Sequence, residues 1–281
     1  MKFILMGRGG LLTSTILKEL LRKSVCPAYV IIENVNTQYP NLTRIICEKN
    51  NIDYCIPESI NSSETIQTIK NIDHEYVIVA SLGVIIKKKI LACSNFFNVH
   101  AGVLPDYKGA HPNFWKIKNG DDVYGVTIHQ MVERVDSGRI VLIHEKDYSE
   151  IINGYDLAIH TFIDAGNALY KCLKGNLFNN HSSFTSQISS GTYYRKFNEN
   201  DFEIDRALPV RTNYKIINRI QYYGKPFIIL NNKRLNIYAA NLLLDVNSYS
   251  DRSNYYRINE DTIIAQAKDG IMELKYVEYD S

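Results

Sequence analysis

The chain has 281 residues, of which 45% are hydrophobic and 22% charged, and its formal net charge is +2. These values are typical of a soluble globular protein with one large domain, or a domain with an appendage. A charge this close to neutral gives no reason to expect a nucleic-acid partner, which usually needs a concentrated basic face.

The N-terminus and the cysteines indicate the cellular compartment in which the protein is expected. No apolar stretch approaches the ~20 residues of a membrane-spanning helix, and the first ten residues lack the apolar core of a signal peptide. The five cysteines form no C-x-x-C pair, which favours scattered, reduced thiols over a disulfide or zinc framework. We therefore expect a cytoplasmic protein with no membrane contact and no metal.

Strand and helix patterns alternate along the first hundred residues. Such alternation predicts right-handed βαβ crossovers, and so an α/β, Rossmann-like, mostly parallel sheet flanked by helices. The predicted strands are 2–7, 28–34, 53–57, 75–81 and 96–101, and the predicted helices are 13–24, 41–51, 62–72 and 84–93.

The second half of the chain changes character. A helix is predicted at 111–120, strands at 124–131 and 139–148, and a long helix at 155–175. The polar, Ser/Asn-rich stretch 176–191 reads as a connector. Beyond it we expect a short helix and several strands, including a hairpin that turns at 268–270. This pattern predicts two domains, 1–190 and a smaller, β-rich region 191–281.

Two polar side chains lie at the end of the apolar strand 96–101. Asn98 and His100 are two residues apart, and side chains at i and i+2 of a strand share a face. The strand ends at the carboxyl edge of the predicted sheet, where open α/β sheets bind ligands. Taken alone, the pair fits a capping asparagine and a hydrogen-bonded core histidine equally well.

Asp136 lies in V-D-S-G, in the loop between the strands 124–131 and 139–148. An Asp-Ser-Gly sequence is also common in plain β-turns. Together with N-x-H and the loop L-P-x-Y-K-G, however, it forms one constellation. We expect Asn98, His100 and Asp136 to converge at one edge of the sheet.

The sequence MGRGG follows the first strand and precedes a helix. A glycine-rich turn there lets a phosphate approach the backbone, and Glu33 after the second strand could bind a ribose. The G-x-G-x-x-G pattern is incomplete, because Leu12 stands where its third glycine would be. A tight strand–helix turn is therefore favoured over a dinucleotide site.

The segments FNVHAGVLPDYKGAHPNFWKIKNG and YGVTIHQMVERVDSGRIV resemble the N10-formyltetrahydrofolate-dependent formyltransferases. The motif of that family reads approximately N-x-H-x-S-x-L-P-x-[YF]-[RK]-G, then G-V-T-[IV]-H, then D-x-G. Asn98, His100 and Asp136 fall on its three catalytic positions. Gly102 departs from the motif, which usually has Ser. Because this position shapes the loop, we expect it to modulate activity and not to abolish it.

The resemblance implies direct formyl transfer to an amine by a catalytic domain at 1–190. The Asn98 amide and a histidine N–H can donate to the oxyanion that develops on the formyl oxygen. His100, with an ordinary pKa of about 6.5, can accept the proton of the amine. Asp136 can orient the imidazole, stabilise its charged form or order a water.

N10-formyltetrahydrofolate is the co-substrate that the resemblance implies, with no metal. The segment YVIVASLGVIIKKKIL looks like the one whose backbone faces the pterin in this family. The expected cofactor-binding residues are Ser81, Leu82, Gly83, Val84, Ile85, Val132 and Val135.

The family formylates glycinamide ribotide, initiator methionyl-tRNA and nucleotide-linked amino sugars. GAHPNFWKIKNG and GTYYRKF look most like the sugar branch, which acts on dTDP- or UDP-linked amino-dideoxy sugars for lipopolysaccharide O-antigen. We expect a dTDP-4-amino-4,6-dideoxyhexose type of substrate, with 191–281 binding substrate and forming a homodimer. The expected substrate-binding residues are Gly9, Lys108, Trp115, Tyr193, Tyr194, Lys196 and Tyr222.

Plainer interpretations stay open for several of these residues. Paired tyrosines are often half-buried surface in a chain with 20 of them, and Trp115 also fits a packing role. Methionyl-tRNA formyltransferase is the nearest alternative function. The stretch ENVNTQYPNLTR, where tRNA enzymes carry a basic loop, has one Arg and no Lys, which favours the sugar enzymes. A dinucleotide-binding Rossmann protein is the alternative from another class.

Overall fold

The computed structural model describes residues 2–36, 38–187, 190–244, 254–267 and 269–278. The chain divides into two compact units that interleave in sequence. The first comprises Met1–Pro112, Tyr124–Lys146 and Ile159–Tyr194, and the second comprises Asn113–Val123, Asp147–Ala158 and Arg195–Ser281. The domain division at residues 190 and 191 stays a prediction.

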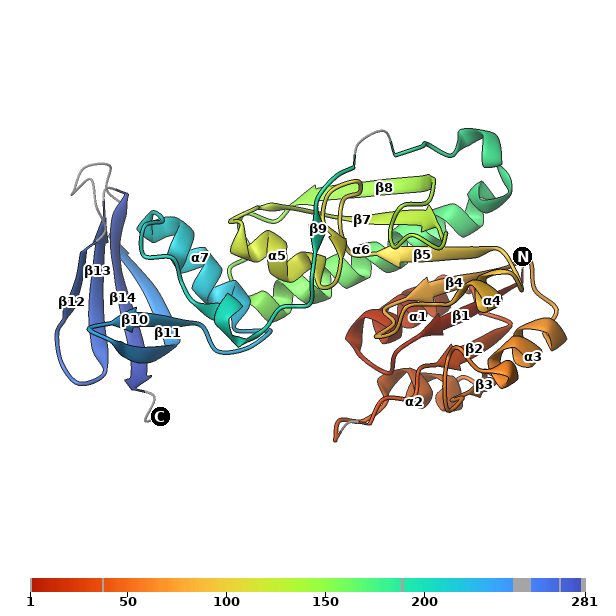
Figure 1. Cartoon of the computed structure of the whole chain (residues 1–281), viewed down its shortest axis with the longest axis horizontal. Coiled ribbons are helices and arrows are strands. Elements are labelled where there is room, and N and C mark those ends of the chain that lie inside the picture. The colour runs from red at the N-terminus through yellow and green to blue at the C-terminus, as the bar shows by residue number, and fades with distance from the viewer. Residues whose placement is uncertain (1, 37, 188–189, 245–253, 268, 279–281) are drawn as a thin grey trace. The chain divides into compact units, whose positions relative to one another are not determined.

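The first unit is built on a seven-stranded sheet. Its strands are β1 (Phe3–Gly7), β2 (Tyr29–Ile32), β3 (Tyr54–Cys55), β4 (Tyr76–Ala80), β5 (Phe96–His100), β7 (Val123–Gln130) and β8 (Ile140–Asp147). The strand order is β3-β2-β1-β4-β5-β7-β8 (Figure 1). The pairs from β3 to β5 are parallel, and β5 pairs antiparallel with β7. The predicted α/β class with a mostly parallel sheet is confirmed.

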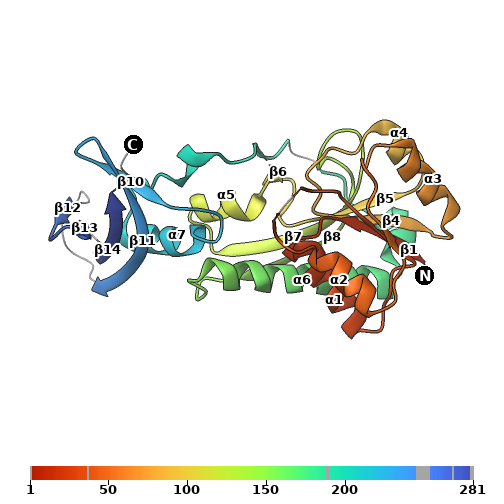
Figure 2. The same cartoon turned by 90° about the horizontal axis from the view of Figure 1, so that it is seen from below.

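Helices cover both faces of this sheet (Figure 2). They are α1 (Leu11–Arg22), α2 (Leu42–Lys49), α3 (Ser63–Asn71), α4 (Lys88–Leu91) and α6 (Gly154–Lys174). Alternate residues of β1 point to opposite faces: Phe3 and Leu5 pack with residues of α1, α2 and α6, whereas Ile4 and Met6 pack with residues of α3 and α4. Full burial of one such side chain contributes about 1.5–3 kcal/mol. The apolar alternation thus fixes which face each helix covers.

A small parallel ladder accompanies the sheet and was not predicted. It joins β6 (Lys108–Gly109) to β9 (Tyr193–Tyr194), with Lys108 opposite Tyr193. The predicted connector 176–191 contains two 3₁₀ helices, η1 (Leu177–Asn179) and η2 (His181–Ser183), and Thr185 forms an antiparallel bridge with Ile140. Residues 188–189 of the connector lie outside the described residues.

The second unit carries a five-stranded sheet of order β10-β11-β14-β13-β12 (Figure 1). Its elements are α5 (Pro112–Lys118), η3 (Glu199–Phe202), α7 (Val210–Ile220), β10 (Phe227–Leu230), β11 (Lys233–Leu244), β12 (Asn254–Arg257), β13 (Thr262–Ala267) and β14 (Gly270–Glu278). All described pairings in it are antiparallel. The predicted β-rich region and its hairpin are confirmed, although Lys268 of the turn lies outside the described residues.

Candidate active site

Strand β5 presents Asn98 and His100 on one face. Across the antiparallel pair with β7, Asn98 lies opposite His129, and His100 lies opposite Thr127. The flanking residues Phe97 and Val99 point to the other face and join the core. The i, i+2 spacing therefore aims both polar side chains at the same place, as the sequence predicts.

Asp136 reaches the same place from the loop between β7 and β8. Its backbone is left-handed, with φ of 48°, a conformation that costs a non-glycine residue about 1 kcal/mol or more. The turn also needs Gly138, because a Cβ there would lie 1.8 Å from the Gln130 carbonyl oxygen. The backbone N–H of Gly109 donates to Asp136 Oδ2 over 2.8 Å and holds the carboxylate in place.

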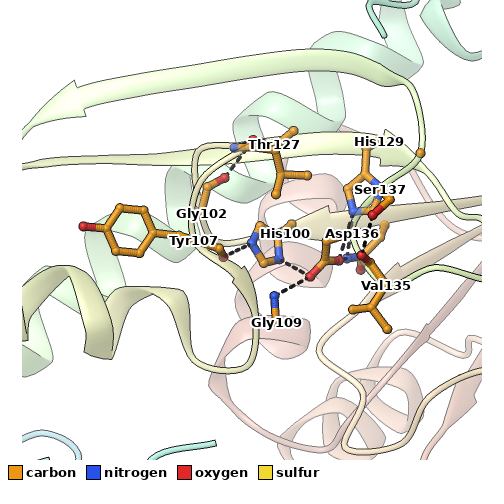
Figure 3. A network of polar contacts seen from close by, with 12 residues as sticks. His100, Gly102, Tyr107, Gly109, Thr127, His129, Val135, Asp136 and Ser137 are labelled. Carbon is orange, nitrogen blue, oxygen red and sulfur yellow. Dashed lines mark hydrogen bonds and ion pairs between the residues drawn. The ribbon is translucent and has the colours of Figure 1, made fainter. Parts of the chain in front are cut away.

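His100 and Asp136 form a buried acid–imidazole pair (Figure 3). Nδ1 of His100 lies 3.6 Å from Asp136 Oδ2, and the two side chains are 6% and 8% exposed. Nε2 lies 2.8 Å from the Tyr107 carbonyl oxygen, which can only accept. The neutral ring therefore carries its proton on Nε2, and Nδ1 is the basic nitrogen.

Burial and the neighbouring groups shift the pKa values of both members of this pair. It lowers the pKa of His100 below its ordinary 6.5, by more than the nearby Asp136 raises it. Burial alone would raise the pKa of Asp136, but the His100 and His129 rings and the Gly109 N–H together hold it well below its ordinary value. Near neutral pH the pair is thus a neutral imidazole beside a carboxylate.

His129 completes the cluster. Its Nδ1 lies 2.9 Å from the Gln130 carbonyl oxygen, so the neutral ring carries its proton on Nδ1 and accepts on Nε2. Nε2 also lies 3.4 Å from Asp136 Oδ1, where a protonated ring would pair with the carboxylate. Asn98 Nδ2 donates to that Nε2 over 3.2 Å and to Asp136 Oδ1 over a longer 3.5 Å. His129 thereby fixes which way the Asn98 amide points.

Thr127 shapes the loop after β5. Its hydroxyl donates to the Gly102 carbonyl over 2.7 Å (Figure 3) and accepts from the Leu104 N–H over 3.0 Å. A Cβ at position 102 would lie 2.7 Å from His100 Nε2 and 2.9 Å from Pro112 Cβ. Glycine therefore permits the observed position of the His100 ring, which explains the departure from the family motif at this residue.

The predicted pterin-facing residues lie on two neighbouring loops. Leu82 and Met131 pack against the same core cluster, and Lys88 forms an ion pair of 2.8 Å with Glu133. Val84 is 46% exposed, Ile85 68% and Val132 43%. Leu82, Gly83 and Ser81 are partly buried, as is Val135. Their role in binding the co-substrate remains a prediction.

Glu33 is hydrogen-bonded to the loop that contains Gly83. Its Oε2 accepts from the Gly83 N–H over 2.7 Å and lies 3.0 Å from Arg8 Nε, and the side chain is 8% exposed. Oε2 of this carboxylate thus holds the strand–helix turn together. The geometry thus favours the tight strand–helix turn over a dinucleotide site.

Four predicted substrate residues lie in the first unit. Gly9 packs against Asn41, whose Cγ would lie 2.5 Å from a Cβ at that position. Lys108 is buried, with its ammonium donating to the Ser190 carbonyl over 2.8 Å. Tyr194 stacks on Tyr107 at 5.2 Å. Tyr193 is 65% exposed.

Three more lie in the second unit. The Trp115 indole donates to the Arg195 carbonyl over 3.0 Å, and the Arg195 guanidinium lies 5.4 Å from its ring. Tyr222 contacts Tyr155 and Tyr223, and burial raises its pKa. Lys196 is exposed. Substrate binding by these residues remains a prediction.

Sequence reasoning missed several groups around the cluster. Nε2 of Gln187 donates to the Asp136 and Gly138 carbonyls, and Thr192 Oγ1 accepts from the Tyr107 N–H. Gln187 falls near the end of the predicted connector and Thr192 directly follows it, where polar composition gives no positional signal. The position of His129 opposite Asn98 could have been predicted from an antiparallel pairing of the two strands.

Two negative findings concern the described part of the chain. Within it, no helix is both long and apolar enough to cross a membrane. No group of three or more His, Cys, Asp or Glu side chains in that part could hold a metal ion.

The sheet, with its N-x-H strand and aspartate turn, has the Rossmann-like formyltransferase fold. An N-formyltransferase from Helicobacter canadensis, solved with folinic acid and dTDP-3-aminofucose, matches with a TM-score of 0.68 at 17% identity, covering 99% of this chain and 100% of that one. WlaRD, a sugar 3N-formyl transferase solved with dTDP and 5-N-formyl-THF, also gives 0.68, at 18% identity, covering 99% and 98%. A methionyl-tRNA formyltransferase from Clostridium thermocellum gives 0.60 at 15% identity, covering 99% and 100%.

Sequence comparison gives matches over parts of the chain. Residues 31–157 match the model of the formyl transferase family, and this match supports membership of the chain in it. A methionyl-tRNA formyltransferase from Thermotoga sp. (strain RQ2) is 35% identical over 108 residues, 38% of this chain and 34% of that protein. One from Thermotoga neapolitana is 26% identical over 247 residues, 85% of this chain and 76% of that protein. The first alignment thus spans about a third of the relative's length.

Proposed function

We propose that this protein transfers the formyl group of N10-formyltetrahydrofolate to the amine of a nucleotide-linked amino sugar, of the dTDP-4-amino-4,6-dideoxyhexose type, for O-antigen-type glycans. One observation carries formyl transfer: Asn98, His100 and Asp136 meet in a single buried polar cluster within the segment that matches the formyl transferase family. A homodimer remains a prediction.

His100 is the proposed base. The co-substrate supplies an activated formyl group, whose carbon bonds to the attacking amine as its bond to N10 breaks. Nδ1 of His100 takes the proton that the amine loses, because Nε2 is committed to the Tyr107 carbonyl. The charged ring then pairs with the Asp136 carboxylate, 3.6 Å away. His100 can return this proton to the departing nitrogen, which balances the transfer.

Asn98 is the proposed oxyanion donor. One of its Nδ2 hydrogens is directed at His129 Nε2 over 3.2 Å, and the other at Asp136 Oδ1 over 3.5 Å. The longer contact is at the limit of a hydrogen bond. That N–H is therefore the one available to a developing oxyanion, while His129 keeps the amide oriented.

The exposed apolar side chains suit a flat heterocycle. Val84, Ile85 and Val132 are between 43% and 68% exposed, on loops joined by the Lys88–Glu133 ion pair. Ligand sites are lined mainly by apolar groups with a few placed polar atoms. These loops are the proposed contact surface for the pterin of the co-substrate.

The charge pattern supports a sugar acceptor over tRNA. In the second unit Arg195 pairs with Asp201, Lys233 with Glu278 and Arg234 with Glu199, each within 2.9 Å. Arg44, the one basic residue of ENVNTQYPNLTR, pairs with Glu48 over 2.8 Å. Sustained contact with many tRNA phosphates needs clustered cations that carboxylates do not neutralise. Two of the similar structures were solved with dTDP-3-aminofucose or with dTDP, and this supports a nucleotide-sugar acceptor.

Methionyl-tRNA formyltransferase is the second candidate. The Thermotoga neapolitana enzyme of that name aligns with 85% of this chain at 26% identity. A site that formylates an aminoacyl ester and one that formylates a sugar amine need the same proton acceptor and oxyanion donors. The acceptor must therefore be settled by experiment.

The test presents both acceptors side by side. The protein is incubated with N10-formyltetrahydrofolate and either dTDP- and UDP-linked 3-amino and 4-amino sugars or charged initiator tRNA. Mass spectrometry then detects the formyl amide. Formylation of a nucleotide sugar supports the proposal. Formylation of the tRNA alone would overturn the acceptor, and formylation of neither would overturn the transfer itself.

A further inference from the structure

The segment 184–194 runs past both loops of the candidate active site, and its residues 184–187 and 190–194 are described. Near its start, Thr185 exchanges two backbone hydrogen bonds of 2.8 Å with Ile140. Near its end, the Lys108 N–H donates to the Thr192 carbonyl and the Ala110 N–H to the Tyr194 carbonyl. The segment is thus anchored at two points, one beside each loop.

Gln187 holds the Asp136 turn. Its Nε2 donates to the Asp136 carbonyl over 3.0 Å and to the Gly138 carbonyl over 2.8 Å. Its Oε1 accepts no hydrogen bond among the described residues. The Gln187 amide therefore bonds both ends of the turn. Asp136, whose backbone is left-handed, lies in this turn and carries the proposed catalytic carboxylate.

Thr192 holds the loop that orients His100. Its Oγ1 accepts from the Tyr107 N–H over 3.0 Å, and the Tyr107 ring stacks on Tyr194. Tyr107 is left-handed, with φ of 56°. Its carbonyl accepts the hydrogen bond from His100 Nε2. Thr192 therefore acts on His100 through a single residue, Tyr107.

No direct hydrogen bond fixes the distance between His100 and Asp136. At 3.6 Å, Nδ1 and Oδ2 are too far apart for a hydrogen bond. Their separation must come from the supports of the two loops. The direct supports are the Gly109 N–H on Asp136 Oδ2 and the Tyr107 carbonyl on His100 Nε2. The segment 184–194 adds one support to each loop, through Gln187 and Thr192.

We propose that Gln187 and Thr192 are positioning residues, which from one segment set the distance between the Asp136 carboxylate and the His100 ring. The consequence for catalysis rests on the proposed function, but the geometry does not. Outer contacts that orient a functional group typically change activity by about 10–100-fold when removed.

The titration of His100 reports this distance directly. The groups that face its ring are the Asp136 carboxylate, the His129 ring and the Tyr107 carbonyl. Asp136 raises the pKa of His100 against the effect of burial. If the carboxylate recedes by about 1 Å, the pKa of His100 falls further, by about 0.7 unit at an effective dielectric constant of about 20.

The experiment is an NMR titration of the histidine rings in ligand-free protein, with His100→Ala used to assign the His100 resonance. Gln187→Met keeps the side-chain volume and removes the donor, and Thr192→Val keeps the shape and removes the acceptor. We expect each to lower the His100 midpoint by about 0.7 unit. Thr192→Ser, which retains the hydroxyl, should have the wild-type His100 midpoint. Gln67→Met is the matched control, because Gln67 is exposed and its side chain donates to the neighbouring Asn71 Oδ1, away from the candidate active site.

Activity forms the second readout. Both variants should lose about 10-fold in kcat with little change in KM. Midpoints equal to that of the wild type in both variants would overturn the proposal, and a lower melting temperature alone would assign the residues a merely structural role. Because the titration needs no substrate, a shifted midpoint without formyl transfer would contradict only the proposed function.

Discussion

The imidazole of His100 donates from Nε2 to the backbone carbonyl of Tyr107 over 2.8 Å. This one hydrogen bond fixes the tautomer and leaves Nδ1 as the basic nitrogen, facing Asp136. The loop after β5 thus sets which atom of the ring can take a proton. A histidine with both nitrogens facing solvent would have no such preference.

The pH dependence of turnover follows from the protonation of His100. Burial lowers its pKa below 6.5, and the neutral ring is the active form. Activity should therefore be full above this pKa and fall as pH decreases through it, with a midpoint below 6.5. Asp136 stays ionised over this range because its pKa is held well below its ordinary value. The profile of kcat at saturating substrates checks this, and an acid limb centred above 6.5 would contradict it.

Replacing Asn98 by Ala should lower kcat by about 100-fold or more, because it removes the proposed oxyanion donor. The fold should persist, since the Asn98 amide bonds to the His129 and Asp136 side chains and not to the backbone of another element. Thermal melting and single-turnover kinetics measure the two effects. Wild-type turnover in a folded Asn98→Ala protein would exclude this donor role.

His129→Leu tests the orientation of the Asn98 amide. The variant keeps an apolar side chain on β7 but loses the acceptor that lies 3.2 Å from Asn98 Nδ2. The amide is then free to turn, and we expect kcat to fall about 10-fold with KM nearly unchanged. A large increase in KM with normal kcat would point instead to a role in substrate binding.

Gly102→Ser introduces the residue usual in the family motif. Its Cβ would lie 2.7 Å from His100 Nε2, so the ring or the loop must shift and weaken the bond to Tyr107. We expect kcat to fall about 10-fold in a protein that still folds. Gly10→Ala is the control, because a Cβ there meets nothing within 4 Å. Equal kcat in both variants would show that the ring tolerates a side chain at position 102.

Arg219 should matter for stability. Its buried guanidinium donates to the Ile151 and Tyr148 carbonyls and pairs with Asp122 over 2.8 Å. Arg219→Met should lower the free energy of unfolding by about 2–4 kcal/mol, because buried acceptors lose their partner. Denaturant unfolding, with the exposed Arg22→Met as control, measures this loss. A loss no larger than that of the control would contradict it.

The fold was predictable where periodicity carries information. Alternating apolar strands and helices predict the parallel sheet, and the two-residue spacing of Asn98 and His100 predicts their shared face. The D-S-G turn locates Asp136, because Gly138 fits a close approach to Gln130 that other residues cannot make.

The supports of the site were not predictable. Gln187 reaches a carbonyl 51 residues away, and Thr192 accepts from a backbone N–H 85 residues away. Hydrogen bonds from a side chain to a distant part of the backbone leave no periodic pattern and no characteristic composition in the sequence. For the same reason, a lysine in a motif loop reads as a surface cation, whereas Lys108 is buried against the Ser190 carbonyl.

The most direct measurement is formyl transfer from N10-formyltetrahydrofolate to a dTDP-linked 4-amino sugar by the wild type and by His100→Ala, run together and read by mass spectrometry. We predict one formyl amide per sugar from the wild type, and turnover lower by about 100-fold or more in the variant, which should still unfold in one cooperative thermal transition. Formylation of initiator methionyl-tRNA alone, or undiminished turnover in His100→Ala, would contradict this account.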